Sequence, residues 1–299
     1  MFKTHERFIE YYKRIGAKIE VYKGIIWTEY QKIVQPLGPA KLDYSVSEEE
    51  AKLLLSRFPG SLLIRYTTGF SNIAESNEWY AVIQDKFLDL EDIPSKNRSE
   101  IRRGLRNCKV SLVDAELVAD KGYEVFIAAF ERYRDVKRPQ IEKEEFKRKI
   151  DITRDFEDII DYWGVFYQNE LIAYATVYKY DNIEADYSTI KFHPNYLKLY
   201  PSYALFYTMN KYYLGEKHFE YVNDGFRNIL HQTNIQNFLI EKFKFRKEYV
   251  NLKIIYKPWI NYLLDTTFPV RYLFGKLNPK LQALYKLEEI RRICDESNK

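Results

Sequence analysis

DYWGVFYQNELIAYATVYKYDNIEADYSTIKF, residues 161–192, decides the fold because it predicts a strand pair followed by a third strand. The first two strands flank Gln168 and Asn169, a polar pair typical of a two-residue hairpin turn. The chain continues as HPNYLKLYPSYALFYTMNKYYL (193–214), where Pro201 stands at the predicted start of an amphipathic helix. HFEYVNDG (218–225) then predicts a further strand, and IQNFLIEKF (235–243) a further helix. This order predicts an α/β (α+β) fold with a mixed, twisted sheet flanked by helices.

The junction between the third strand and the helix at Pro201 predicts one of two things. The backbone N–H groups of a first helical turn have no internal partners, and the helix dipole adds positive potential, so an anion such as pyrophosphate would bind there. An ordinary strand-to-helix crossover has the same pattern, so the junction by itself leaves both interpretations open.

Composition limits the class of protein. The chain has 299 residues, of which 46% are apolar, enough for a sizeable core in one large or two small domains. A formal charge of +4 excludes a strongly basic protein that coats nucleic acid, and the two cysteines, Cys108 and Cys294, exclude a disulfide scaffold. We expect no metal, because no group of cysteines or histidines has metal-ligand spacing. No apolar run has the length of a membrane span, so we expect a cytoplasmic protein.

Turn-forming residues and helix caps along the chain predict three parts. Residues 1–93 form a small α/β unit, in which Ser47 and Glu50 make a capping box for a helix and residues 34–47 form a loop. Pro94 marks a boundary, and residues 94–260 form the main domain. Residues 261–299 form a helical tail that packs within the chain or makes a dimer contact; the oligomeric state is open.

A basic segment opens the main domain. SKNRSEIRRGLRNCK (95–109) places Arg98, Arg102 and Arg106 four residues apart, on one face of a helix, with Arg103 beside them. The face is either simply solvated or contacts phosphates, of a cofactor or of an RNA end.

From residue 161 to residue 259, the chain resembles the GNAT superfamily of acyltransferases, and its FemAB-like branch more than the small acetyltransferases. In that family the central strand ends in a loop that binds the pyrophosphate of acyl-CoA, a helix packs behind it, and the next strand splays away to admit the pantetheine arm. FemAB-like enzymes take an aminoacyl group from tRNA, and their second domain opens with a basic segment like residues 95–116. The resemblance makes the N-terminal unit a reduced first GNAT-like half.

The resemblance implies which residues hold the donor, and the motifs depart from the family in two places. The donor-binding residues would be Asn234 and the cradle formed by Tyr196, Leu197, Lys198, Leu199, Tyr200, Pro201 and Ser202. That cradle contains no glycine, whereas the family loop is Gly-rich. The closing helix reads IEKFKF, with Ile240 where the family has a thiol-protonating Tyr and Lys244 where it has Gly.

Acyl transfer to an amine requires a proton acceptor and a donor to the developing oxyanion. We assign catalytic roles to Asp186 and Tyr187 in the central strand and to Asp224 in the turn that ends the next strand. The reason is that strand ends meet at the cleft of an open sheet. Asn223 and Arg227 are the substrate-binding candidates. Asp224 has an alternative role as a turn residue beside Gly225, and Arg227 one as half of a surface ion pair.

The predicted function is N-acyl or aminoacyl transfer from acyl-CoA, such as acetyl-CoA, or from aminoacyl-tRNA. The acceptor would be an amine on a small molecule or a peptide. The alternatives are a non-catalytic binding module that keeps the GNAT-like fold, and an RNA-contacting protein that uses the face from Arg98 to Arg106.

Overall fold

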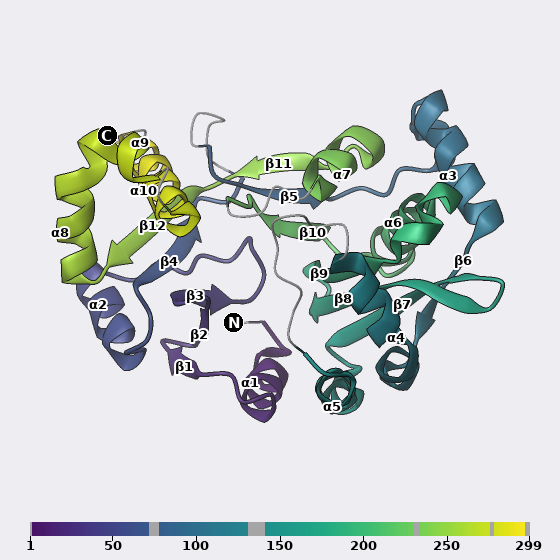
Figure 1. The fold of residues 1–299 in the computed structure, drawn as a ribbon, viewed down its shortest axis with the longest axis horizontal. Helices are drawn as coiled ribbons and strands as arrows, with labels where there is room; N and C mark the ends of the chain where they lie inside the picture. Colours follow the sequence, from purple (N-terminus) through teal and green to yellow (C-terminus); the bar gives the residue numbers. More distant parts are fainter. Residues whose placement is uncertain (1, 72–77, 131–140, 230–233, 276–277, 297–299) are drawn as a thin grey trace.

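The protein consists of two twisted sheets side by side, each covered by helices (Figure 1). The computed structural model describes residues 2–71, 78–130, 141–229, 234–275 and 278–296. Both sheets mix parallel and antiparallel pairs, which confirms the predicted mixed α/β architecture.

The first sheet has the order β1-β2-β3-β4-β12. Its strands are β1 (Ile19–Tyr22), β2 (Ile25–Tyr30), β3 (Ile33–Leu37), β4 (Leu63–Thr68) and β12 (Asn251–Tyr256). The helices around it are α2 (Glu48–Arg57), α8 (Pro258–Thr267), α9 (Arg271–Gly275) and α10 (Pro279–Glu296). The first helix, α1 (His5–Arg14), shares a core with residues of both sheets.

The second sheet has the order β11-β5-β10-β9-β8-β7-β6. Its strands are β5 (Tyr80–Gln84), β6 (Lys109–Val113), β7 (Ile160–Tyr167), β8 (Glu170–Tyr180), β9 (Glu184–Phe192), β10 (Tyr221–Phe226) and β11 (Arg246–Tyr249). Its helices are α3 (Ser95–Asn107), α4 (Ala115–Phe130), α5 (Lys143–Asp151), α6 (Pro201–Asn210) and α7 (Ile235–Phe243). One core lies under α3, α6 and α7, and another lies under α1, α4 and α5.

The two sheets repeat one pattern of strand pairing. In the first, β1, β2 and β3 pair antiparallel in turn, β3 pairs parallel with β4 after the crossover helix α2, and β4 pairs antiparallel with β12. In the second, β7, β8 and β9 pair antiparallel in turn, β9 pairs parallel with β10 after the crossover helix α6, and β10 pairs antiparallel with β5. The N-terminal unit is thus a smaller copy of the second sheet's architecture.

Each sheet receives one strand from the other part of the chain. β5 precedes the boundary expected at Pro94, yet it lies between β10 and β11 in the second sheet. The run 246–256 divides at Val250 into β11 in the second sheet and β12 in the first. Because each sheet contains a strand from the other part of the chain, we expect the two halves to fold together.

Local signals in the sequence place most turns and helix starts. Gln168 and Asn169 have φ of 49° and 65°, as a two-residue hairpin turn requires, and Ser47 and Glu50 form the predicted capping box. The prediction of a loop over 34–47 is wrong for residues 34–37, which belong to β3. Pro36 is tolerated there because β3 pairs with β4 only through Ile33 and Val34. At Pro36 the edge of β3 that faces β4 therefore has no partner strand.

The predicted C-terminal helix is α10, and it packs within the chain. It covers β12, and the backbone N–H of Leu252 donates to the Sγ of Cys294 at 3.4 Å. Of the helices in the described ranges, none combines the length and apolar character that crossing a membrane would require.

Candidate functional site

The candidate site lies where the parallel strands β9 and β10 part. The two strands pair only at Tyr221 with Glu184, Val222 with Ala185 and Asn223 with Asp186. Beyond these pairs β9 runs on toward α6, while β10 stays paired with β5 on its other side, with an irregular register between Asn223 and Phe226. Asp224 and Gly225 lie in this β-bulge, a feature that re-aims side chains next to functional sites.

Glu184 is buried and connects the site to the N-terminal half through hydrogen bonds. Its carboxylate accepts hydrogen bonds from the backbone N–H of Ala40 (2.6 Å), the hydroxyl of Tyr221 (2.5 Å) and the side-chain amide of Asn223 (2.9 Å). Burial raises the pKa of Glu184, while these three hydrogen bonds act in the opposite direction. The carboxylate therefore joins β9, β10 and the segment after β3 at one point.

Two further carboxyl groups flank this point. Asp186 follows Glu184 by two residues and so shares its face of β9, and Asp224 directly follows the paired Asn223. Burial raises the pKa of Asp224 to about 8. Burial, followed by the charges of Glu184 and Asp224, raises the pKa of Asp186 well above its ordinary value. The structure thus brings together Asp186 and Asp224, and a carboxyl with a pKa near 8 suits a proton acceptor at neutral pH.

Tyr187 belongs to a buried chain of hydrogen bonds. Its hydroxyl donates to Oδ1 of Asn210 (2.7 Å), the Asn210 amide donates to Oε1 of Gln84 (2.6 Å), and the Gln84 amide donates to the Phe243 carbonyl (2.7 Å). Burial, together with the charge of Asp224, raises the pKa of Tyr187 well above its ordinary value. This series of hydrogen bonds links β9, α6, β5 and α7. A catalytic role for Tyr187 stays a prediction.

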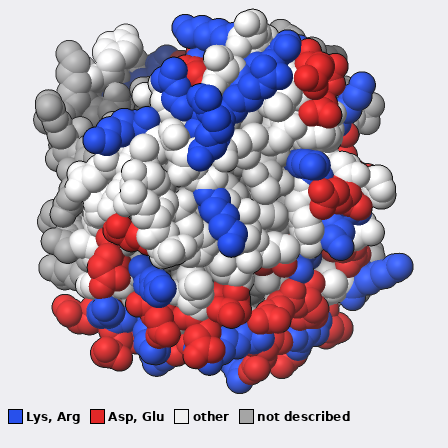
Figure 2. Space-filling model, turned by 90° about the vertical axis from the view of Figure 1, so that its right-hand side faces the viewer, with Lys and Arg blue, Asp and Glu red and all other residues white. Residues whose placement is uncertain are grey.

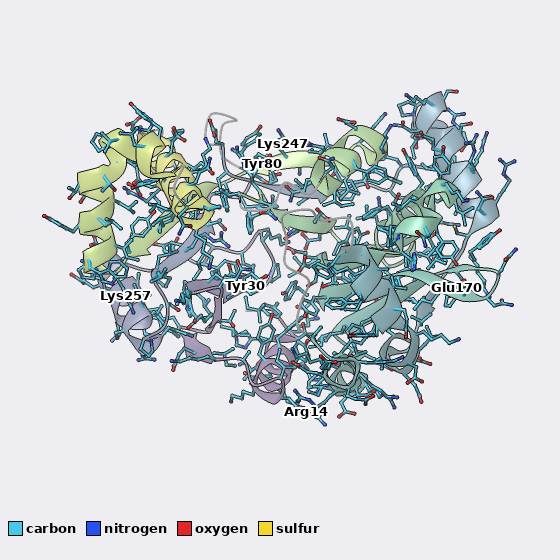
Figure 3. The ribbon with its side chains drawn as sticks, viewed as in Figure 1. Arg14, Tyr30, Tyr80, Glu170, Lys247 and Lys257 are labelled. Carbon is cyan, nitrogen blue, oxygen red and sulfur yellow. The ribbon has the colours of Figure 1, made fainter. Side chains whose placement is uncertain are left out.

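Asn223 and Arg227 have partners within the protein. Oδ1 of Asn223 accepts from the N–H of Gly225 (2.8 Å), so Asn223, rather than Asp224, makes the side-chain turn bond. Arg227 forms an ion pair with Glu78 (3.1 Å), and its guanidinium lies 5.8 Å from the ring of Tyr80. Figure 3 labels Tyr80 beside Lys247 of the neighbouring strand β11, whose Nζ is 4.8 Å from the same ring. Binding of substrate by Asn223 and Arg227 stays a prediction.

The expected donor cradle is a short helical turn that leads into α6. Pro194–Leu199 form a 3-10 helix, Tyr200 has a left-handed φ of 64°, and Pro201 is the first residue of α6, as predicted. Tyr196 donates to Glu170 at 2.6 Å, at the tip of the β7–β8 hairpin labelled in Figure 3. Leu197 accepts from the Tyr200 N–H, Lys198 is exposed, and Ser202 is half-buried. Whether these residues bind a donor stays a prediction.

Helix α3 packs directly against this cradle. Gly104 allows the approach, because a Cβ there would lie 2.5 Å from the carbonyl oxygen of Tyr200 and 3.1 Å from the nitrogen of Ala204. Asn107 donates to the Leu199 carbonyl (3.3 Å), and Arg103 donates to the Tyr200 hydroxyl (3.1 Å). The basic helix and the candidate donor loop are thus neighbours, although they lie about a hundred residues apart in the sequence.

Helix α7 closes the other side of the parting strands. Asn234 occupies its N-cap position but makes no side-chain cap bond. The amide of Gln236 lies 3.3–3.4 Å from the carbonyl oxygens of Asp224, Gly225 and Phe226, so it holds the bulge from outside. Ile240 packs against the core.

The sequence did not point to four side chains that shape the site: Glu184, Gln84, Asn210 and Gln236. Glu184 and Asn210 sit in strand and helix patterns that otherwise read as apolar, and a polar residue in such a pattern signals a buried partner. Their partners come from distant segments, as with Ala40 and Glu184, so no local spacing could reveal them.

The fold recurs in solved structures of low sequence identity. FemX shares 12% identity over 86% of this chain and 92% of that one, with a TM-score of 0.56. The C-terminal DUF2156 domain of a putative lysylphosphatidylglycerol synthetase from Agrobacterium fabrum shares 12% over 89% and 92%, with a TM-score of 0.54. A conserved protein of unknown function from Bacteroides thetaiotaomicron shares 9% over 84% and 89%, with a TM-score of 0.52. No protein-family model and no curated protein matches the sequence.

These likenesses, together with the parting of β9 and β10, define the class of fold. The chain has a GNAT-like fold of the FemAB-like kind, which confirms the resemblance seen in the sequence. At 9–12% identity the likeness concerns the fold alone, and the site residues rest on their own geometry.

Proposed function

We propose that the protein transfers an acyl or aminoacyl group to an amine, with Asp224 as the proton acceptor. The observation that carries this proposal is the position of Asp224 in a bulge where two parallel strands part in a GNAT-like fold, since burial there raises its pKa to about 8. The charge of Asp224 contributes to the raised pKa of Asp186, and the hydrogen bond from Asn223 to Glu184 joins β10 to β9 beside the bulge.

The chemistry follows from the charge of the acceptor. A primary amine is mostly protonated at neutral pH and is a nucleophile only as the neutral form. Its nitrogen bonds to the donor carbonyl carbon as the ester bond of aminoacyl-tRNA, or the thioester bond of acyl-CoA, breaks. The amine proton passes to Asp224, which then gives it to the leaving oxygen or sulfur. The acceptor is a small-molecule or peptidyl amine.

The surroundings of the donor loop favour aminoacyl-tRNA over acyl-CoA. Arg102, Arg103 and Arg106 are exposed on α3, and Lys and Arg side chains gather at the end of the molecule that carries this helix (Figure 2). Arg98 instead donates to the carbonyls of Ile93 and Glu91. A basic surface next to the donor loop fits a long phosphate backbone. A synthetase of lysylphosphatidylglycerol, by its name, makes an aminoacylated product, and it shares this fold.

Replacing Arg102, Arg103 and Arg106 together by glutamine should weaken tRNA binding. Each lost phosphate contact reduces the slope of log K against log salt by about 0.7–0.9, so the triple variant should have a slope lower by about 2. Filter binding at four or more salt concentrations measures it. The matched control replaces Lys147, Arg148 and Lys149 of α5 by glutamine; equal slopes for the two variants would exclude α3 as the contact surface.

A non-catalytic binding module is the second candidate function. The observation in its favour is Ile240, which places an apolar side chain where the family has a thiol-protonating Tyr. Such a module would bind the donor without releasing its acyl group, so hydrolysis or transfer of labelled aminoacyl-tRNA separates it from the enzyme.

A further inference from the structure

The first sheet contains its own parting pair of parallel strands. β3 and β4 pair only at Ile33 with Leu63 and Val34 with Ile64, and then diverge. The next residues are Gln35 on β3 and Arg65 on β4. By position after the last pair, Arg65 corresponds to Asp224 in the second sheet, and Gln35 corresponds to Tyr187. The first half therefore carries a cation where the second carries a carboxyl.

Arg65 has no anionic partner in the part of the chain that the structure describes. Its Nη2 donates to Oε1 of Gln35 at 2.6 Å, and its guanidinium lies 5.5 Å from the ring of Trp79. Among the residues that the structure describes, no carboxylate lies within ion-pair distance of it. Burial lowers the pKa of Arg65 to about 10, so it stays charged at neutral pH. A desolvated charge without a counter-ion is unfavourable, and proteins rarely keep one without a use.

A cavity of about 100 Å³ adjoins Arg65, far larger than the roughly 10–15 Å³ that one water needs. Its lining includes Gln35, Thr67, Trp79 and Phe226. The Nε1–H of Trp79 is buried and, within the described ranges, has no hydrogen-bond partner. A guanidinium that donates to Gln35, and an indole N–H without a partner in the described ranges, therefore belong to residues around one small space.

We propose that this cavity binds a carboxylate or phosphate group, held by the guanidinium of Arg65. The fork of N–H donors in a guanidinium matches two oxygens of either group. Phe226 lines the cavity and follows Asp224 by two residues in β10, so the site lies where the two halves meet. Resting on the proposed function, the bound anion is part of the amine acceptor, which makes the acceptor an anionic molecule rather than a plain alkylamine.

The test measures anion binding directly and requires no transfer assay. Inorganic phosphate and malonate are titrated separately by calorimetry into wild type, Arg65→Met and the control Arg57→Met, which removes an exposed arginine of α2. We expect at least one anion to bind wild type and the control with equal affinity, and to bind Arg65→Met at least tenfold more weakly. The anion that binds identifies the group as phosphate or carboxylate.

Stability separates a binding role from a structural one. Without added anion, Arg65→Met should melt at the same or a higher temperature than wild type, because it removes a desolvated charge. Equal binding of both anions by wild type and Arg65→Met, or binding by neither, would overturn the site. So would a large loss of stability in Arg65→Met without ligand. Anion binding that depends on Arg65 in a protein without transfer activity would uphold the site and reject the proposed function.

Discussion

Replacing Asp224 by asparagine is expected to lower the rate of group transfer by about 10²–10⁴-fold, the usual contribution of a general base. The amide has nearly the same shape but cannot take the proton of the amine. The bulge should persist, because the contacts that hold it come from Asn223 and from Gln236 through backbone carbonyls. Single-turnover transfer of labelled aminoacyl groups to an amine measures the rate.

The pH dependence of the transfer rate tests whether the variant is slow because it lacks the proton acceptor. Only ionised Asp224 accepts a proton, so the wild-type rate should rise with pH through an inflection near 8 that the variant lacks. The pKa of Asp224 is higher in the folded protein than in the unfolded chain, so folding takes up a proton between about pH 4 and pH 8. The contribution of this group to stability is therefore present at low pH and lost as pH rises through about 8. Between about pH 4 and pH 8, the melting temperature of the variant should fall by less than that of wild type.

Asp265→Asn is the matched control, because Asp265 is an exposed carboxylate on α8. It should leave both the rate and the pH profile unchanged. A wild-type rate in Asp224→Asn would remove Asp224 as the base and leave Asp186 as the remaining carboxyl of the pair.

Replacing Glu184 by alanine should produce the largest loss of stability near the site. The change leaves the Ala40 N–H, the Tyr221 hydroxyl and the Asn223 amide without their acceptor in a buried place. Each unsatisfied buried group costs about 1–3 kcal/mol, and water entering the space left by the side chain offsets part of it. We expect the free energy of unfolding to fall by about 2–5 kcal/mol in urea titrations.

Glu49→Ala, at an exposed position of α2, controls for the loss of a carboxylate and should change stability by at most about 0.5 kcal/mol. Equal stability of the two variants would mean that Glu184 does not join the halves. Because Glu184 also bonds Asn223, its loss should in addition disturb the paired ends of β9 and β10.

The sequence predicted the second sheet better than the first because its signals there are local. The hairpin turn at Gln168 and Asn169, and Pro201 at the start of α6, each act within a few residues. The exchange of β5 and β12 had no such signal, since a strand's own pattern shows that it pairs but not with which strand. Part of β3 was predicted as a loop because Pro36 is typical of loops. The sequence does not show that β4 pairs with β3 no further than Val34, which is what allows a proline in this strand.

The proximity of two candidate site residues could be predicted from the sequence, while their roles stay predictions. The rule that strand ends meet at the cleft placed Asp186 and Asp224 together, as the structure has them. The packing of α3 on the candidate donor loop, and the hydrogen bond from Ala40 to Glu184, join residues about a hundred or more positions apart. Such contacts depend on the complete fold, so a single sequence could not reveal them. The donor, the acceptor and a cytoplasmic location stay predictions.

The most direct measurement is the melting temperature of the protein with aminoacyl-tRNA, uncharged tRNA, acetyl-CoA or free CoA, because a ligand that binds only the folded state raises it. We expect aminoacyl-tRNA to raise the melting temperature more than uncharged tRNA, and the two CoA compounds to leave it unchanged. A rise with acetyl-CoA alone would keep the transferase but reverse the choice of donor. No change with any of the four would contradict the proposed transfer from either donor.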